Sequence, residues 1–82
     1  MINVINRHVG QALKELRRQS EKTQEQIASL LSVPQSFVSK VETGERSLKL
    51  YEAYAYADAL GIDVAELVAA VGEQIAAFGG EE

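Results

Sequence analysis

The feature that most constrains this chain is a pair of short helical patterns joined by a very short turn, within residues 24–42. Apolar side chains recur there at helical spacing, and they are Ile27, Ala28, Leu31, Val33, Val38 and Val41. The turn is Ser32–Val33, and Pro34 follows where the second helix starts, a position at which its missing backbone N–H costs little. Because an isolated helix of about eight residues is unstable in water, flanking helices must hold this pair in place.

The flanking helices are predicted from apolar periodicity and from residues that start and stop helices. Thr23 with Gln26 has the capping-box pattern, as does Asp63 with Glu66. We expect an all-α fold of five helices and no strand, over residues 6 to about 20, 24–31, 35–42, about 49–60 and 63–78. Asn6 is the expected cap of the first helix, and residues 1–5 form an arm or pack on the core. The fourth helix should bury the stripe Leu50, Ala53, Tyr54, Ala57 and Leu60.

Length and composition narrow the class of protein further. The chain has 82 residues, which predicts one domain over residues 1–82, and it has no cysteine, which excludes disulfides and thiolate metal sites. It lacks an apolar run of roughly 20 residues and an N-terminal signal pattern, so we expect a cytoplasmic protein without a membrane segment. We see no paired acid and base, no partnered nucleophile, no phosphate-binding glycine loop and no metal cluster. We therefore expect no enzymatic activity, no metal and no cofactor.

The charge is divided between the two halves of the chain. A net charge of −4 argues by itself against a nucleic-acid partner. However, residues 1–49 hold all eight Lys and Arg with five acids, a balance of +3, whereas residues 50–82 hold seven acids and neither Lys nor Arg, a balance of −7. This polarity predicts one face for an anionic partner and another face turned away from it.

The third predicted helix carries polar side chains away from its apolar positions. They are Gln35, Ser36, Ser39 and Lys40. Glutamine can pair with adenine, lysine can reach guanine, and serine can bond base edges or phosphates. The start of the second helix, at Gln24, directs backbone N–H groups and an amide toward a phosphate. These residues fit a helix that reads the major groove of duplex DNA, although composition alone favours a solvated helix surface.

The run TQEQIASLLSVPQSFVSKVETGER, residues 23–46, resembles the helix-turn-helix of the phage Cro and repressor family, also called the XRE family. The similarity extends from LKELR at residues 13–17 through ADALG at 57–61 to DVAEL at 63–67. The resemblance implies a five-helix, lambda-repressor-like domain with its helix-turn-helix at about residues 23–42. The chain departs from the family pattern at three positions. Ser32 stands where a glycine is usual, Lys22 stands where an apolar residue is usual, and Leu48 stands where a proline is frequent.

The resemblance also implies roles for individual residues. Gln35 and Ser36 would contact bases, Ser39 and Lys40 would contact bases or phosphates, and Gln24 and Arg46 would contact phosphates. Beside the resemblance, we expect phosphate contacts from Lys22 and Thr23, which precede Gln24. Arg17 and Glu42 match a pair that forms an internal salt bridge in the family. A buried pair of this kind would lock the first helix to the third, whereas two exposed charges would contribute little.

The last predicted helix, residues 63–78, carries apolar residues at a spacing typical of helix–helix contacts. These residues are Val68, Val71, Ile75 and Phe78, here called the predicted dimer row. One interpretation is that the helix packs back on its own domain. The alternative, which we favour, is a two-fold dimer that places two recognition helices about 34–36 Å apart, on half-sites about 10 bp apart.

Two classes of function remain. The first is a sequence-specific, dimeric DNA-binding regulator, a repressor that reads a near-palindromic operator. The second is a protein-interaction module on the same fold, such as an antirepressor or an antitoxin-like adaptor, which the acidic second half favours. Under either function, a further protein could regulate this one, and the sequence does not identify it. Steep salt dependence of duplex DNA binding would separate the two.

Overall fold

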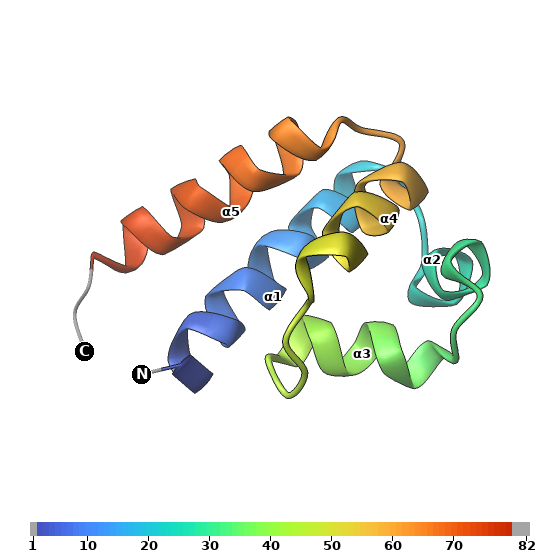
Figure 1. Ribbon diagram of the computed structural model, residues 1–82, viewed down its shortest axis with the longest axis horizontal. Helices are drawn as coiled ribbons and strands as arrows, with labels where there is room; N and C mark the ends of the chain where they lie inside the picture. The colour runs from blue at the N-terminus through green and yellow to red at the C-terminus, as the bar shows by residue number, and fades with distance from the viewer. Residues whose placement is uncertain (1, 80–82) are drawn as a thin grey trace.

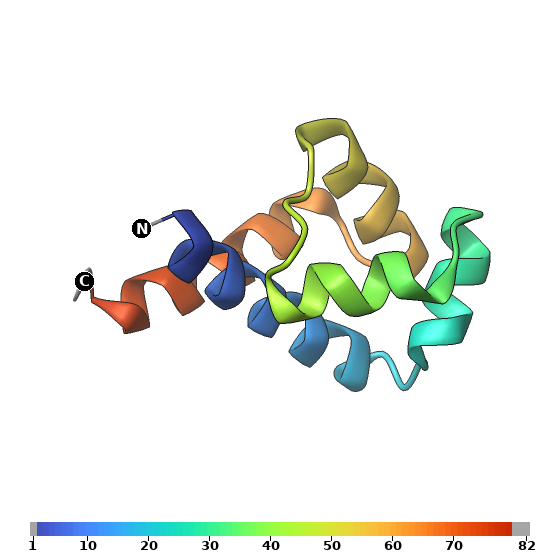
Figure 2. The same ribbon diagram turned by 90° about the horizontal axis from the view of Figure 1, so that it is seen from below.

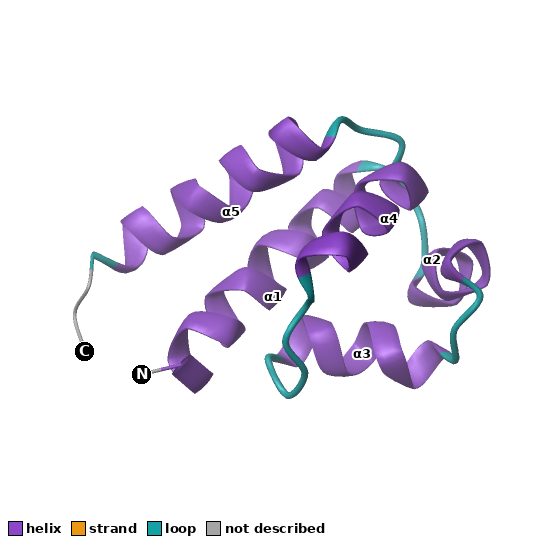
Figure 3. Cartoon of the chain, in the orientation of Figure 1, coloured by secondary structure: helices purple, strands orange, loops and turns teal. Residues whose placement is uncertain are grey.

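The computed structural model describes residues 2–79, and within this range all regular secondary structure is helical, as predicted. The helices are α1 (Ile2–Gln19), α2 (Gln24–Leu31), α3 (Gln35–Thr43), α4 (Leu50–Leu60) and α5 (Val64–Phe78). Short loops join them (Figure 3). None of the described helices combines the length and hydrophobicity needed to cross a membrane.

The first helix is longer than the sequence pattern predicted. It begins at Ile2, so of the two alternatives for residues 1–5 the arm is wrong for the described residues 2–5, and the expected cap at Asn6 is also wrong. Asn6 lies inside α1, and its Nδ2 donates to Ser47 Oγ over 2.9 Å. The added turns lie beside the end of α5 (Figure 1), and the side chains of Val4 and Ile5 are partly buried. Tertiary packing thus extends a helix whose start carries no capping residue.

Helix α1 is the centre of the arrangement. α5 packs along one side of it and α3 packs against another, while α2 contacts α3 and α4 (Figures 1 and 2). The crossing of α1 and α3 is very close, because a Cβ at Gly10 would meet the carbonyl oxygen of Val41 and lie 2.5 Å from that of Glu42. Only glycine fits at this crossing without moving the backbone of α3.

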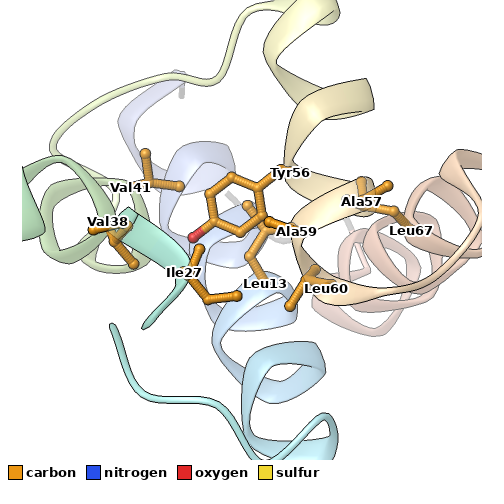
Figure 4. Packing of buried hydrophobic residues seen from close by; sticks show 10 residues of the cluster. Leu13, Ile27, Val38, Val41, Tyr56, Ala57, Ala59, Leu60 and Leu67 are labelled. Atoms are coloured by element: carbon orange, nitrogen blue, oxygen red, sulfur yellow. The ribbon is translucent and has the colours of Figure 1, made fainter. Parts of the chain in front are cut away.

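All five helices contribute to one apolar core (Figure 4). Its fully buried side chains of largest volume are Leu13, Ile27, Val38, Val41 and Tyr56. The predicted stripe of α4 is partly wrong, because Leu50 is 78 % exposed and Tyr54 is 61 % exposed. Ala57 and Leu60 of the stripe are buried as predicted, Ala53 packs partly buried against the core, and Tyr56 and Ala59 complete the buried face.

The local signals around the two central helices behave mostly as predicted. Thr23 and Gln26 form both hydrogen bonds of the capping box at the start of α2. Ser32 ends α2 with φ 59° and ψ 44°, in the left-handed region that glycine adopts without strain.

The second predicted capping box, at the start of α5, is wrong, since the Asp63 side chain makes no cap hydrogen bond there. Its backbone carbonyl accepts from the Glu66 N–H over 3.0 Å instead.

Candidate nucleic-acid interface

Helix α3 buries one side and exposes a row of polar side chains on the other. Val38 and Val41 face the core, whereas Gln35, Ser36 and Lys40 are exposed and Ser39 is partly buried. These four polar residues are called the reading face below. Thr43 is also exposed and follows at the same helical spacing, so the polar row continues for another turn. Sequence reasoning missed Thr43 because it assigned this residue to the end of the helix.

A buried carboxylate ties this helix to the others. The side chain of Glu42 is 3 % exposed, and its Oε2 accepts from Arg17 Nε over 2.6 Å. Its Oε1 accepts from Arg17 Nη2 over 3.2 Å and from Gln24 Nε2 over 2.9 Å. Arg17 Nη1 also donates to the carbonyl of Lys22 over 2.9 Å. One ion pair therefore joins α1, the start of α2 and α3.

The ion pair also affects the pKa values of two groups, Arg17 and the buried Tyr56. The hydrogen bond to Glu42 raises the pKa of Arg17 above its ordinary value, because it stabilises the charged guanidinium. Burial raises the pKa of the Tyr56 hydroxyl, and the nearby Glu42 charge raises it further. Removing either partner of such a pair would leave an unpaired charge in the core, which costs about 3–5 kcal/mol. The pair thus holds the reading face rigidly on the core.

The two glutamines at the starts of α2 and α3 are in contact. Gln35 Nε2 lies 3.3 Å from Gln24 Oε1, so both amides belong to the network that begins at Arg17. Lys22, Thr23 and Gln24, the predicted phosphate contacts at this end, lie together just before and at the start of α2. The hydroxyl of Thr23 is engaged in the cap, where it accepts from the Gln26 N–H over 3.1 Å.

Arg46, the other predicted phosphate contact, has partners within the protein. Its Nη1 and Nη2 donate to the two carboxylate oxygens of Glu52 over 2.9 and 3.0 Å. Its guanidinium carbon lies 4.2 Å from the centre of the Phe37 ring. The side chain is still 32 % exposed, so a phosphate at this position would share the guanidinium with Glu52. The sequence pattern did not indicate this pairing.

The predicted dimer row is divided by the packing of α5. Val68 is 56 % exposed, whereas Val71, Ile75 and Phe78 are partly buried. The Phe78 ring centre lies 4.4 Å from that of His8 on α1, a contact that the sequence did not indicate. The early turns of α1 thus cover part of the row from inside the same chain. The exposed Val68 borders a surface hollow whose other apolar members include Val9, Leu13, Leu48, Leu50, Ala53, Leu67 and Val71.

Across the described residues, the His, Asp and Glu side chains form no group of three that could bind a metal ion. What the site does contain is a short helix fixed by a buried ion pair, with amide, hydroxyl and ammonium groups exposed along it. This arrangement defines a helix-turn-helix DNA-binding protein. The chain belongs to the helix-turn-helix family, whose model matches residues 13–67.

Solved structures show the same relationship, and they identify the XRE type of regulator. The restriction-modification controller protein C.AhdI from Aeromonas hydrophila is 38 % identical, with 74 % of this chain and 92 % of that chain covered and a TM-score of 0.69. An XRE-family like protein from Pseudomonas syringae pv. tomato str. DC3000 is 32 % identical over 87 % of each chain, with a TM-score of 0.74. The clp gene regulator ClgR from Corynebacterium glutamicum shares the fold, at 21 % identity, a TM-score of 0.84, and coverage of 94 % and 82 % of the two chains.

No curated protein matched the sequence. The family match and the similar structures nevertheless confirm the resemblance to the XRE family and the helical fold that it implied. The protein is a DNA-binding transcription regulator of the XRE type.

Proposed function

We propose that this protein is a sequence-specific repressor that reads the major groove of a near-palindromic operator through α3. The observation that carries the proposal is the exposure of Gln35, Ser36 and Lys40 on a short helix that the Arg17–Glu42 ion pair fixes to the core. A fixed helix lowers the entropy that must be lost when side chains meet base edges. We place the helix-turn-helix at about residues 23–42, within the family match.

We propose a role in the DNA complex for each of these side chains, from the hydrogen bonds that it can form. The amide of Gln35 can pair with an adenine, and the ammonium of Lys40 can reach a guanine. Ser36 and Ser39 can bond base edges or phosphates. The start of α2, with Lys22, Thr23 and Gln24, offers backbone N–H groups and a positive helix end to a phosphate. Arg46, in the loop after α3, would add a contact to the phosphate backbone of the DNA.

We further propose that two copies bind DNA as a symmetric dimer. The exposed Val68 of the predicted dimer row and the exposed Leu50 of α4 border the same apolar hollow. Covering these side chains would remove apolar surface from water. Since Phe78 stacks on His8 within the chain, we centre the dimer contact on Val68 and Leu50, with Val71 and Ile75 at its side.

The test of DNA reading is selection of bound sites from random duplex DNA, followed by titration of the selected site against a scrambled duplex at several salt concentrations. We expect a two-fold symmetric sequence, binding that weakens steeply with salt, and a clear preference over the scrambled duplex. Absence of binding at low salt, with capture of a defined protein partner instead, would favour the protein-interaction module and overturn the proposal.

The dimer is tested separately with Val68→Asp. Because Val68 is exposed, the variant should fold, sediment as a monomer and bind the operator much more weakly. Ala69→Asp is the matched control, since Ala69 is exposed beside it but turned about 100° around α5. A parent protein that already sediments as a monomer and binds DNA one copy at a time would contradict the dimer.

A further inference from the structure

Helix α1 carries a row of exposed cations that the reading face does not include. Arg7, Lys14 and Arg18 are all exposed, and they follow one another at spacings of seven and four residues. These spacings place them on one side of a helix, with Gln11 between the first two. The row, here called the basic row, is about 16 Å long, from the rise of a helix per residue.

The packing of α1 shows which way the basic row faces. Gly10 and Arg17 face α3, through the backbone of Val41 and the carboxylate of Glu42. On another side, Ala12 and Leu16 line a surface hollow together with residues of α5. The basic row lies between these two sides, turned away from the core. Seen from below, α1 and α3 lie next to each other (Figure 2).

At one end the basic row adjoins the polar row of α3. The backbone and Cγ of Arg7 pack against Gly44, the residue that ends α3. Arg7 also lines a surface hollow together with Thr43, which continues the reading face, and with Glu45. The hydrogen bond between Asn6 and Ser47 fixes this part of α1 to the loop after α3. The two exposed rows therefore form one continuous surface.

The charges of this row lack the partners that other cations of the chain have. Arg17 and Arg46 form ion pairs, whereas none of Arg7, Lys14 and Arg18 has a carboxylate within 4.0 Å in residues 4–79. Lys14 and Arg18 are four residues apart, a placement at which like charges destabilise a helix by a few tenths of a kcal/mol. Glu15, the acid within this stretch of α1, lies toward α5, beside Glu73. In residues 4–79 this surface thus carries three cations that form no ion pair, and Glu45 is the acid that shares a hollow with Arg7.

We infer that the basic row is a second contact surface for duplex DNA, at which Arg7, Lys14 and Arg18 bind phosphates of the backbone beside the groove that α3 enters. The inference rests on the proposed function. A strand presents a phosphate every 3.4 Å or so along the duplex axis, so a row of about 16 Å faces several of them. Such contacts position the protein on the duplex and carry no base preference.

The experiment compares the parent with the triple variant Arg7→Gln, Lys14→Gln and Arg18→Gln, using the selected operator duplex across a range of salt. The matched control changes Ala69, Ala76 and Ala77 of α5 to Glu, which alters the net charge by the same three units at exposed positions away from α3. We expect the triple variant to lose affinity at low salt and to show a shallower dependence of log K on log salt, by about 1 for each lost contact per protomer.

The preferred operator sequence should stay unchanged in the triple variant, and its thermal unfolding should show that it remains folded. The control should keep the salt slope of the parent. A triple variant with the parent's slope, or a control with the same reduction, would overturn the inference. A parent that binds no DNA at low salt would overturn the proposed function itself, which makes the two failures distinguishable.

Discussion

Gln35, at the start of α3, donates from its Nε2 to the Oε1 of Gln24, at the start of α2, over 3.3 Å. Gln24 in turn donates to Glu42, which is held by Arg17. An amide expected to read a base is therefore oriented through an amide expected to hold a phosphate, and both are anchored to a buried ion pair. Hydrogen-bond chains of this kind hold side chains in one orientation more firmly than isolated contacts do.

This coupling predicts different effects for the two glutamines. Gln35→Ala should relax the preference at one or two operator positions and cost about 1–3 kcal/mol of binding. Gln24→Ala should weaken binding to all sequences, because a phosphate contact carries no base information. It should also relax the preference at the positions that Gln35 reads, because it removes the amide that orients Gln35. Titrations against the operator and single-base variants of it measure both. Equal affinity and unchanged base preference for Gln35→Ala would contradict its role.

The close crossing of α1 and α3 predicts opposite effects for two glycines. Gly10→Ala should destabilise the fold by roughly 2–3 kcal/mol or more, because its Cβ would meet the backbone of Val41 and Glu42. Gly72→Ala is the control, since a Cβ there meets nothing within 4 Å and Gly72 lies inside α5. The control should stabilise by about 0.5–1 kcal/mol. Urea unfolding measures both, and similar effects at the two sites would refute the close crossing.

The buried hydroxyl of Tyr56 predicts a stabilising substitution. This oxygen has no hydrogen-bond partner within the described residues, although the side chain is fully buried. Tyr56→Phe keeps the ring in the core and removes an unsatisfied polar atom, so the free energy of unfolding should rise by about 1 kcal/mol. Tyr54→Phe, at an exposed position of the same helix, should change little. A loss of stability in Tyr56→Phe would show that the hydroxyl is bonded.

The ion pair between Arg46 and Glu52 predicts a contribution that depends on pH. Hydrogen bonds from Arg46, and then from the Lys49 N–H, hold the pKa of Glu52 below its ordinary value. The stabilisation of the fold by the Glu52 carboxylate is therefore fully present at pH values above the pKa of this group in the unfolded chain. It is lost as the pH falls through the lower pKa of the group in the folded protein. The pair is partly exposed, so its contribution is about 1 kcal/mol or less.

The measurement is urea unfolding of the parent and of Glu52→Gln as a function of pH. At neutral pH the free energy of unfolding should be higher for the parent than for Glu52→Gln. This difference in free energy should shrink as the solution becomes acidic. The difference between the two proteins isolates this carboxyl from the others that titrate in the same range. A difference that grows at low pH would have the wrong sign for a lowered pKa.

Much of the fold was predictable because its signals are local. The capping box of Thr23 and Gln26 and the apolar spacing of residues 27–41 specify α2 and α3 from neighbouring residues alone. The failures occurred where distant segments decide the outcome. The start of α1 depends on α5, and the buried face of α4 depends on which turn reaches the core. Asp63 has the residue type of a cap, yet its side chain makes no cap bond.

For the candidate site, sequence reasoning predicted the polar side chains along α3, of which three are exposed, and the pairing of Arg17 with Glu42. It did not predict the pairing of Arg46 with Glu52, the contact of His8 with Phe78, or the place of Arg7 beside Gly44. Each of these joins residues from different helices or from a helix and a loop. No periodic pattern encodes such a contact.

The sequence by itself determined the helical class, the positions of the two central helices and the polar side chains along the second of them, because periodicity, caps and turns act over a few residues. Only the tertiary structure decided that the basic row of α1 adjoins the end of the polar row of α3 at Thr43, and that His8 of α1 contacts Phe78 of α5. These arrangements depend on how closely whole helices can pack, and a single glycine at the crossing of α1 and α3 sets that distance.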